Sequence, residues 1–428
     1  MLFSQLTQRL NDLGCKPCHV DRLLRGWSQV KTYDRKGSPA ATFFPAALRA
    51  ALPGIEAELE GLARLHGEYP TTLSPALKEL LANRLSPQAG KSLVISRHAG
   101  EGVDVERREV LEQDEVARLL VELADGQMVE SVLLPRGGLC ISTQVGCAVG
   151  CVFCMSGRDG LQRQLSSLEM VAQVVLARRR RAVSKVVFMG MGEPAHNLDN
   201  VLEAIHLLGM QGDIAHKNLV LSTVGDVRVF ERLMPSREPV IPAQAGIQQD
   251  KNSFCINPLD SGLRRNDGTN KLSADLPAVR PALALSLHST DDALRAQLLP
   301  NAPRIPVEEL VARCEEYARA THYPTQYQWT LIEGVNDSDA ELERIIELLS
   351  GKYAIMNFIP FNDVEGLPYR RPAPERLARI VGTLKQRGII TQLRDSAGQD
   401  VEGACGQLRA RAEKKARNPV RPISLSPQ

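Results

Sequence analysis

The segment LCISTQVGCAVGCVFC, residues 139–154, contains Cys147, Cys151 and Cys154, separated by three and then two residues. A short apolar run that predicts a strand precedes these cysteines, and a run with helical spacing follows them. Three thiolates this close on one loop can bind three irons of a 4Fe-4S cluster and leave the fourth iron open. A structural zinc site is the alternative, and it needs a fourth ligand, for which Cys140 is the candidate.

Downstream of Cys140, apolar runs alternate with helical patterns. KVVFMG (185–190) precedes LDNVLEAIHLLG (198–209), and YQWTLIEG (327–334) precedes DAELERIIELLS (339–350). About six such repeats favour parallel β/α units, so residues 135–395 predict a partial (β/α)6 barrel of the α/β class. Chemistry in such barrels lies at the carboxyl ends of the strands, which is where the cysteine loop falls.

The flanking regions differ in pattern from the predicted barrel. Residues 1–90 carry short helical patterns between Gly and Pro breaks and predict a helical accessory domain. Residues 91–134 predict a β-rich connecting segment, although Ala117–Ala124 could be helical. Residues 235–272 have no periodicity and are rich in Pro, Gly, Asn and Asp, which indicates an insertion, with a functional lid as the alternative.

Composition narrows the class of protein. Hydrophobic residues at 43% and charged residues at 24% are typical of a soluble globular chain. No apolar run is long enough to span a bilayer, so we expect a cytoplasmic protein with no membrane partner. Nine cysteines in a cytosolic chain are better explained as ligands or catalysts than as disulfides.

Basic residues gather in two places, although the net charge is only +2. One is the run Arg178–Arg181, and the other is Arg409–Arg421, within a C-terminal segment over residues 396–428. Either run could contact the phosphates of a nucleic acid or form an ordinary solvated surface.

The C-x3-C-x2-C spacing is the signature of radical S-adenosylmethionine (SAM) enzymes, whose open iron binds the amino and carboxylate groups of SAM. Phe153, before the third cysteine, also matches that pattern. The next predicted strand ends in a turn with Gly192 and Glu193, where glycine permits close approach of the backbone to the methionyl amine. The ends of later predicted strands supply further candidate SAM contacts: Ser222, Ser286, Leu287 and His288. Taken alone, His288 is better explained as a structural histidine.

The motifs LCISTQVGCAVGCVFC, FMGMGEP, LSTVG, LSLH, GVND, IPFN and ACGQL occur in this order between Glu130 and Gln407. Through these motifs the chain resembles the RlmN/Cfr family of radical SAM RNA methyltransferases. The resemblance implies methylation of an adenine carbon in ribosomal or transfer RNA, with C2 as the expected position and C8 as the alternative. It also implies an electron donor such as flavodoxin with its reductase. We expect a monomer.

The resemblance further implies roles for four residues outside the cluster loop. Cys405, in ACGQL, matches the methyl-carrying cysteine, Cys140 the resolving cysteine, and Glu130 the proton-accepting glutamate. Asn362, in IPFN, matches a SAM contact. A thiolate is a good nucleophile toward a sulfonium methyl group, so Cys405 would be methylated first. Its methyl group would then pass to adenine as a methylene radical, and a Cys140–Cys405 disulfide would release the product.

Two departures from the family bear on the RNA target. Residues 395–400 read DSAGQD where most members carry an R-G-D-D run, and Met155–Gly157 replace a commoner Ser or Ala followed by Thr. The chain could therefore be a paralogue that acts on another RNA or another adenine carbon. Two other classes remain as alternatives: a radical SAM enzyme of a different reaction class, and a zinc-containing RNA-binding protein without catalysis.

Overall fold

The computed structural model describes residues 2–34, 39–70, 116–234, 279–362 and 367–394. Several sequence predictions lie outside these ranges: the insertion, the methyl-carrying Cys405, the basic tail 409–421, and the elements expected over 75–85 and 91–99.

A single ten-stranded sheet organises the described residues, in the order β1-β2-β3-β4-β7-β8-β9-β10-β11-β12. Its first three strands are antiparallel: β1 (Ala63–Pro70), β2 (Ala117–Leu123) and β3 (Met128–Leu134). The other seven are parallel: β4 (Gly138–Cys140), β7 (Lys185–Phe188), β8 (Leu219–Thr223), β9 (Ala282–Ser286), β10 (Thr325–Leu331), β11 (Ala354–Pro360) and β12 (Thr391–Leu393).

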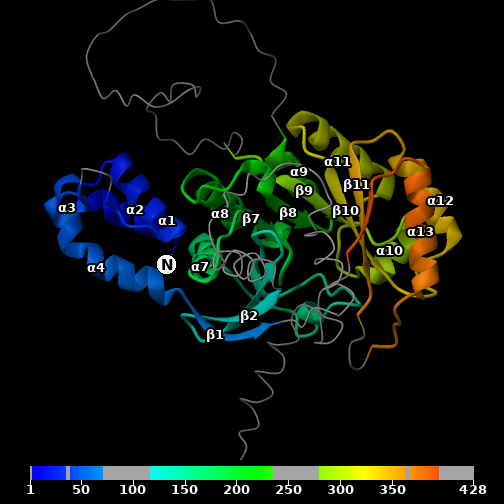
Figure 1. The fold of residues 1–428 in the computed structure, drawn as a ribbon, viewed down its shortest axis with the longest axis horizontal. Coiled ribbons are helices and arrows are strands. Elements are labelled where there is room, and N and C mark those ends of the chain that lie inside the picture. Colours follow the sequence, from blue (N-terminus) through cyan, green and yellow to red (C-terminus); the bar gives the residue numbers. More distant parts are fainter. Residues whose placement is uncertain (1, 35–38, 71–115, 235–278, 363–366, 395–428) are drawn as a thin grey trace, which may run out of the picture.

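Helices connect the parallel strands and cover the outer face of the curved sheet (Figure 1). They are α7 (Ser167–Arg178), α8 (Leu198–Met210), α9 (Val227–Leu233), α10 (Asp292–Leu298), α11 (Val307–Thr321), α12 (Asp339–Leu349) and α13 (Pro374–Gln386). Three short 3-10 turns accompany them: Met155–Gly157, Pro194–Asn197 and His216–Asn218. Six consecutive β/α units result, so the predicted partial (β/α)6 barrel is confirmed.

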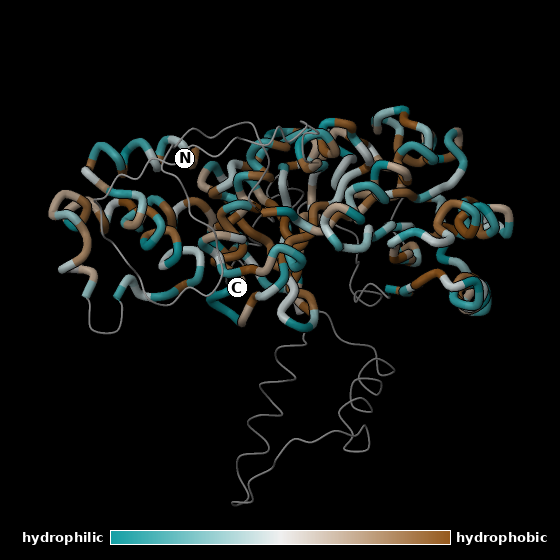
Figure 2. The backbone as a smooth tube through the Cα atoms, turned by 90° about the horizontal axis from the view of Figure 1, so that it is seen from above, coloured by the Kyte–Doolittle hydropathy of each residue, from teal (hydrophilic) through white to brown (hydrophobic). Residues whose placement is uncertain are grey.

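The two faces of each parallel strand have different surroundings. On β10, Tyr327 and Trp329 belong to the main apolar core with α11 and α12, and Gln328 and Thr330 face the inside of the barrel. Hydrophobic segments concentrate in the interior of the molecule (Figure 2). The alternation follows from the two-residue period of a strand, whose successive side chains point to opposite faces.

The N-terminal unit contains α1 (Phe3–Asp12), α2 (Pro17–Gln29), α3 (Ala40–Phe43) and α4 (Ala46–Gly61). The prediction of a purely helical region over 1–90 was wrong at Ala63–Pro70, which pairs with β2 as an edge strand. That stretch, ARLHGEYP, lacks the β-branched residues that signal strands, so only its pairing with β2 reveals it. Ala117–Leu123 is a strand rather than a helix, because β1 and β3 flank it on both sides.

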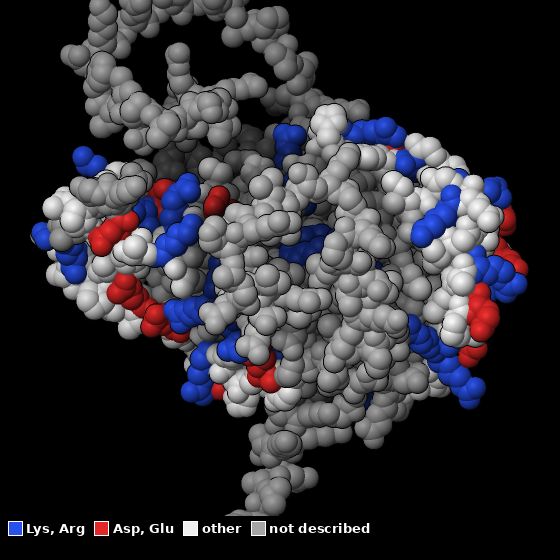
Figure 3. All heavy atoms as spheres, in the orientation of Figure 1, with Lys and Arg blue, Asp and Glu red and all other residues white. Residues whose placement is uncertain are grey.

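The arginine run at the end of α7 forms contacts between the N-terminal unit and the barrel. Arg178 donates to the carbonyl oxygens of Ser28 and Gly212, both at 2.7 Å. The others are also partnered: Arg179 with Glu60, Arg180 with Glu68, and Arg181 with the carbonyl of Leu134. This run therefore serves as a structural contact. On the face shown in Figure 3, visible basic and acidic side chains intermingle around both ends of the molecule.

Among the helices of the described residues, none combines the length and apolar character needed to cross a bilayer.

Candidate active site

The cysteine loop lies between the short antiparallel strands β5 (Gln144–Gly146) and β6 (Leu161–Gln164). Gly146 has a φ of +80°, and a Cβ there would approach the carbonyl oxygen of Gly160 to 2.0 Å. The same carbonyl accepts a hydrogen bond from the Cys147 amide at 3.1 Å. Glycine is therefore required where the loop leaves β5, because any side chain would push the first cysteine off its anchor.

The segment that follows α10 holds the other side of the loop. The Val152 amide donates to the carbonyl of Leu298 at 3.1 Å. Asn301 donates twice, from its backbone amide to Val149 at 3.2 Å and from Nδ2 to Ala148 at 2.9 Å. These bonds attach the cysteine loop to the βα connection after β9.

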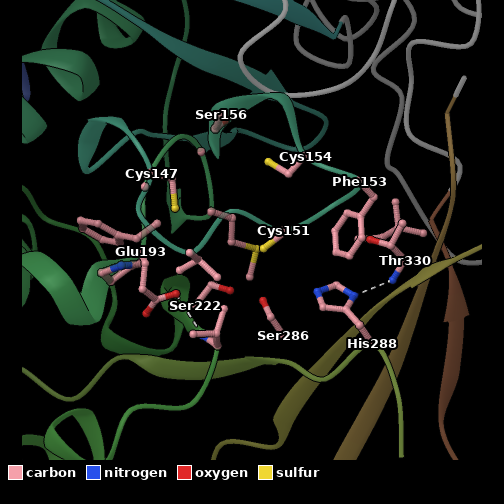
Figure 4. A pocket seen from close by; sticks show the side chains of 18 of the residues that line it. Cys147, Cys151, Phe153, Cys154, Ser156, Glu193, Ser222, Ser286, His288 and Thr330 are labelled. Carbon is pink, nitrogen blue, oxygen red and sulfur yellow. Dashed lines mark hydrogen bonds between the residues drawn. The ribbon is translucent and has the colours of Figure 1, made fainter. Parts of the chain in front are cut away.

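A cavity of about 280 Å³ opens between the cysteine loop and the carboxyl ends of the strands. It is lined by all three loop cysteines and by most of the predicted SAM contacts, namely Gly192, Glu193, Ser222, Ser286, His288 and Asn362. Figure 4 shows the three thiols on the loop side and Glu193, Ser222, Ser286 and His288 across from them. The fold thus brings together residues spread over more than 200 positions of sequence.

Leu287 is the exception among these predicted contacts. Its side chain is fully buried in the main apolar core, and it is not among the residues that line the cavity. Its amide donates to the carbonyl of Gln328, and its carbonyl accepts from Ser289. Leu287 therefore supports the strand end from behind, because adjacent residues of a strand point to opposite faces.

The three thiols suit a cluster better than a single ion. Within the described ranges, no three His, Cys, Asp or Glu side chains converge closely enough to hold one metal ion. A four-iron cube spreads its thiolates over separate corners, so ligands around a cavity fit that group. Cys140, the candidate fourth zinc ligand, lies on β4 and is not among the cavity-lining residues. Burial raises the pKa of Cys147 to about 12, so cationic irons would be needed to hold its thiolate.

Glu193 joins the ends of β7 and β8 at the cavity wall. Its Oε1 accepts from Thr223 Oγ1 at 2.6 Å and from the Ala195 amide at 3.0 Å, and its Oε2 accepts from the Val224 amide at 3.0 Å. Burial raises the pKa of this carboxyl to about 7, although the three hydrogen bonds oppose the shift. Such a carboxylate would gain strongly from a cationic partner, which an ammonium group bound in the cavity would supply.

Turn geometry brings Gly192 against the wall of the cavity. Its φ is +105°, and a Cβ there would meet the Thr143 and Gln144 side chains at 2.7 Å. A side chain at this position would therefore displace residues beside the cysteine loop.

His288 connects β9 to the cysteine loop. Its Nδ1 accepts from the Thr330 amide at 2.9 Å, and its ring lies edge-on to Phe153 with centroids 4.8 Å apart. Burial, with a further contribution from Arg295, lowers its pKa to about 3, so the imidazole is neutral. Because Nδ1 accepts, the ring proton is on Nε2. His288 is thus both a structural histidine and a cavity residue.

Glu130 lies on β3 and Cys140 on the neighbouring strand β4, and neither is among the residues that line the cavity. Glu130 is buried and pairs with buried Arg118 at 3.0 Å. Cys140 packs in an apolar layer with Val187 and Val220, and burial raises its pKa to about 12. The structure therefore buries two of the three predicted catalytic side chains, and the third, Cys405, lies outside the described residues.

Sequence reasoning missed several residues of the site. Thr330 and Ile359 line the cavity from β10 and β11. Buried Arg295, on α10, donates to the carbonyls of Val224 and Ser286, two further cavity residues. Thr330 and Ile359 lie near the ends of predicted strands, and that position could have identified them as candidate site residues. No local feature of the sequence marks Arg295 as a site residue.

Comparison with known proteins agrees with this site. Residues 141–243 match the Radical SAM superfamily. A probable RNA methyltransferase of Pseudomonas aeruginosa strain UCBPP-PA14 is 52% identical over 414 residues, 96% of each chain. One from Leptothrix cholodnii is 52% identical over 99% of each chain.

A solved structure extends the similarity to the fold. The crystal structure of a radical SAM methyltransferase from Sphaerobacter thermophilus matches with a TM-score of 0.62 and 30% identity, over 95% of this chain and 97% of that one. The chain belongs to the radical SAM superfamily and, within it, to the same family as these probable RNA methyltransferases.

Proposed function

We propose that this protein methylates a carbon of adenine, C2 in the first instance, in ribosomal or transfer RNA, through an S-methylcysteine on Cys405. The observation that carries the proposal is the single cavity shared by Cys147, Cys151 and Cys154 with the strand ends that supply the candidate SAM contacts. The names of the relatives at 52% identity support RNA as the substrate class.

Cys147, Cys151 and Cys154 would hold the 4Fe-4S cluster, which when bound supplies the electron that cleaves SAM. Glu193 would receive the ammonium group of SAM, because its buried carboxylate lacks a cationic partner among the hydrogen bonds described for it. Ser222, Ser286 and Asn362 offer polar groups to the rest of the molecule.

Cys405 would act as the nucleophile that removes a methyl group from one SAM molecule. That group, after losing a hydrogen atom to the 5'-deoxyadenosyl radical from a second SAM, would bond to the adenine carbon. Glu130 would accept the proton from that carbon, and its ion pair with Arg118 holds its carboxylate in place. The unpaired electron of the adduct would return to the cluster. The Cys140 thiol would then attack the sulfur of Cys405, forming a disulfide and breaking the bond from sulfur to the methylene carbon, which would take up the thiol proton and become the methyl group; in the structure Cys140 is a free thiol.

This route suits the chemistry of the substrate. An aromatic C–H carbon of adenine is a poor nucleophile toward a sulfonium, so direct polar transfer from SAM is slow. We infer further that the enzyme works in the cytoplasm as a monomer and takes electrons from a flavodoxin-type donor.

The test is mass spectrometry of nucleosides from ribosomal and transfer RNA, prepared separately from cells with and without the gene. We expect one methyladenosine to disappear on deletion, and its retention time distinguishes C2 from C8. Restoring the gene should return the nucleoside, whereas restoring Cys405→Ala or Cys147→Ala should not. An unchanged nucleoside profile in both RNA fractions would contradict the proposal.

Cys405→Ala also distinguishes this function from another radical SAM reaction. The purified variant should still cleave SAM to 5'-deoxyadenosine under reducing conditions but should form no methyladenosine. Continued product formation without Cys405 would show that this cysteine is no methyl carrier.

A further inference from the structure

The inside of the barrel carries a buried polar layer beside the cavity. On β10, Gln328 lies in register with Ser286 of β9 on one side and with Asn357 of β11 on the other. Asn357 is 0% exposed and Gln328 is 5% exposed. Both side chains face the barrel interior, because the residues on either side of Asn357, Met356 and Phe358, belong to the main apolar core.

Three side-chain atoms of these two carboxamides have no hydrogen-bond partner within the described part of the chain. The unpartnered atoms are both Oδ1 and Nδ2 of Asn357, and Nε2 of Gln328. Buried amides are normally hydrogen-bonded, since leaving them unpaired carries the full cost of desolvation. Such a pair indicates a polar ligand that enters the barrel.

The layer adjoins residues that line the cavity. One step further along the same faces, Thr330 and Ile359 line the cavity. Two residues in the other direction along β10, Gln326 accepts from Arg394 at 3.4 Å. A base at the level of Asn357 and Gln328 would therefore lie at the edge of the cavity, close to Ser286.

The donor and acceptor pattern selects the kind of base. A carboxamide presents one donor beside one acceptor, which matches the N7 acceptor and the N6 amine on the major-groove edge of adenine. The corresponding major-groove edge of guanine presents two acceptors, which one carboxamide cannot satisfy in the same way. Gln328 adds a second donor for a ring nitrogen or a hydroxyl.

We propose that Asn357, with Gln328 beside it, binds the edge of the target adenine and selects it over guanine. The inference rests on the proposed function and adds its base-recognition residues. The adenine of SAM presents the same edge, so the test must separate these two sources.

The experiment uses the full-length enzyme with its cluster reconstituted, as wild type, Asn357→Ala, Asn357→Leu and Gln328→Ala. Asn357→Leu keeps the volume and has no polar group to leave unsatisfied, so it guards against a folding defect. Gln386→Ala, which removes an exposed carboxamide at the end of α13, is the matched control. Each protein is assayed for iron content, for 5'-deoxyadenosine formation without RNA, and for methyladenosine formation on RNA from cells lacking the gene.

We expect both Asn357 variants to lose methylation by about tenfold or more, as for a bidentate base contact, while iron content and SAM cleavage stay at wild-type levels. Gln386→Ala should behave as wild type. Parallel loss of SAM cleavage would assign the carboxamides to SAM and overturn the inference, and so would unchanged methylation. If wild-type enzyme forms no methyladenosine, the proposed function itself fails, which is distinct from failure of the variants alone.

A synthetic RNA with purine riboside at the methylated position gives a readout that a structural role would not move. Lacking the N6 amine, it should react more slowly than the adenosine RNA with wild type. With Asn357→Leu the two RNAs should react alike, because a contact already lost cannot be lost again. An equal penalty in both enzymes would show that Asn357 does not contact the base.

Discussion

The side-chain Nδ2 of Asn301 donates a hydrogen bond to the carbonyl oxygen of Ala148 at 2.9 Å, joining residues 153 positions apart. Together with the backbone bond from Asn301 to Val149, it attaches the cysteine loop to the segment after α10. The loop that would hold the cluster therefore depends on a different β/α unit for its position.

Replacing Asn301 by Ala should loosen this attachment by about 0.5–1.5 kcal/mol, the net value of one hydrogen bond. We expect faster release of iron to a chelator from the reconstituted protein, with little change in its melting temperature. Gln297→Ala, at an exposed position of α10, serves as the control. Identical iron release from wild type and Asn301→Ala would show that the bond does not restrain the loop.

Gly146 should tolerate no side chain. Its positive φ costs a substituted residue about 1–2 kcal/mol, and the approach to the Gly160 carbonyl adds a steric clash. Gly146→Ala should therefore lower both the free energy of unfolding and the iron content. Gly126 has a similar positive φ of +79°, but a Cβ there would meet no atom within 4 Å. Gly126→Ala therefore measures the cost of the positive φ without a steric clash. Equal effects of the two substitutions would rule out the clash.

The raised pKa of Glu193 predicts a pH dependence of stability in the cluster-free protein. Its pKa rises from 4.5 to about 7 on folding, so the folded protein binds the extra proton between these values. The contribution of Glu193 to the free energy of unfolding is therefore fully present below pH 4.5 and is lost as the pH rises toward 7. The loss amounts to a few kcal/mol, at about 1.4 kcal/mol per pKa unit.

Urea denaturation at several pH values measures this effect. The free energy of unfolding of the wild type should fall more steeply from pH 5 to pH 7 than that of Glu193→Gln, which cannot titrate. Parallel pH profiles would mean that the pKa of Glu193 does not rise on folding.

The buried pair of Arg118 and Glu130 predicts an asymmetric response to substitution. Arg118→Leu leaves the Glu130 carboxylate buried without its 3.0 Å partner, which should destabilise the fold by about 3–5 kcal/mol. The double variant Arg118→Leu/Glu130→Leu should recover much of this loss, since no unpaired charge remains. Thermal denaturation of the two variants checks the result, and a double variant less stable than Arg118→Leu would contradict it.

The repeated strands and helices were predictable because several of the parallel strands, such as β7, β8 and β9, are short runs of mostly buried apolar residues, and each helix shows its own period. The cysteine loop was recognisable for a similar reason, since its three thiols are close in sequence. Prediction failed where the signal was not local. The edge strand Ala63–Pro70 exists through its pairing with β2, and α4 continues through Pro53 and Gly54 because Ile55 and Leu59 bury their side chains.

The sequence by itself determined the chemistry that the chain can carry, because the cysteine spacing and the order of the rim motifs are one-dimensional features. Only the tertiary structure decided which of those residues share a cavity. It also decided that Leu287 faces the core while Ser286 and His288 face the site, and that the arginine run at the end of α7 holds the N-terminal unit against the barrel. It also placed Asn357 inside the barrel beside the cavity, with no hydrogen-bond partner among the described residues. Burial and hydrogen bonding depend on neighbours distant in sequence, and the closure of the parallel strands brings those neighbours together.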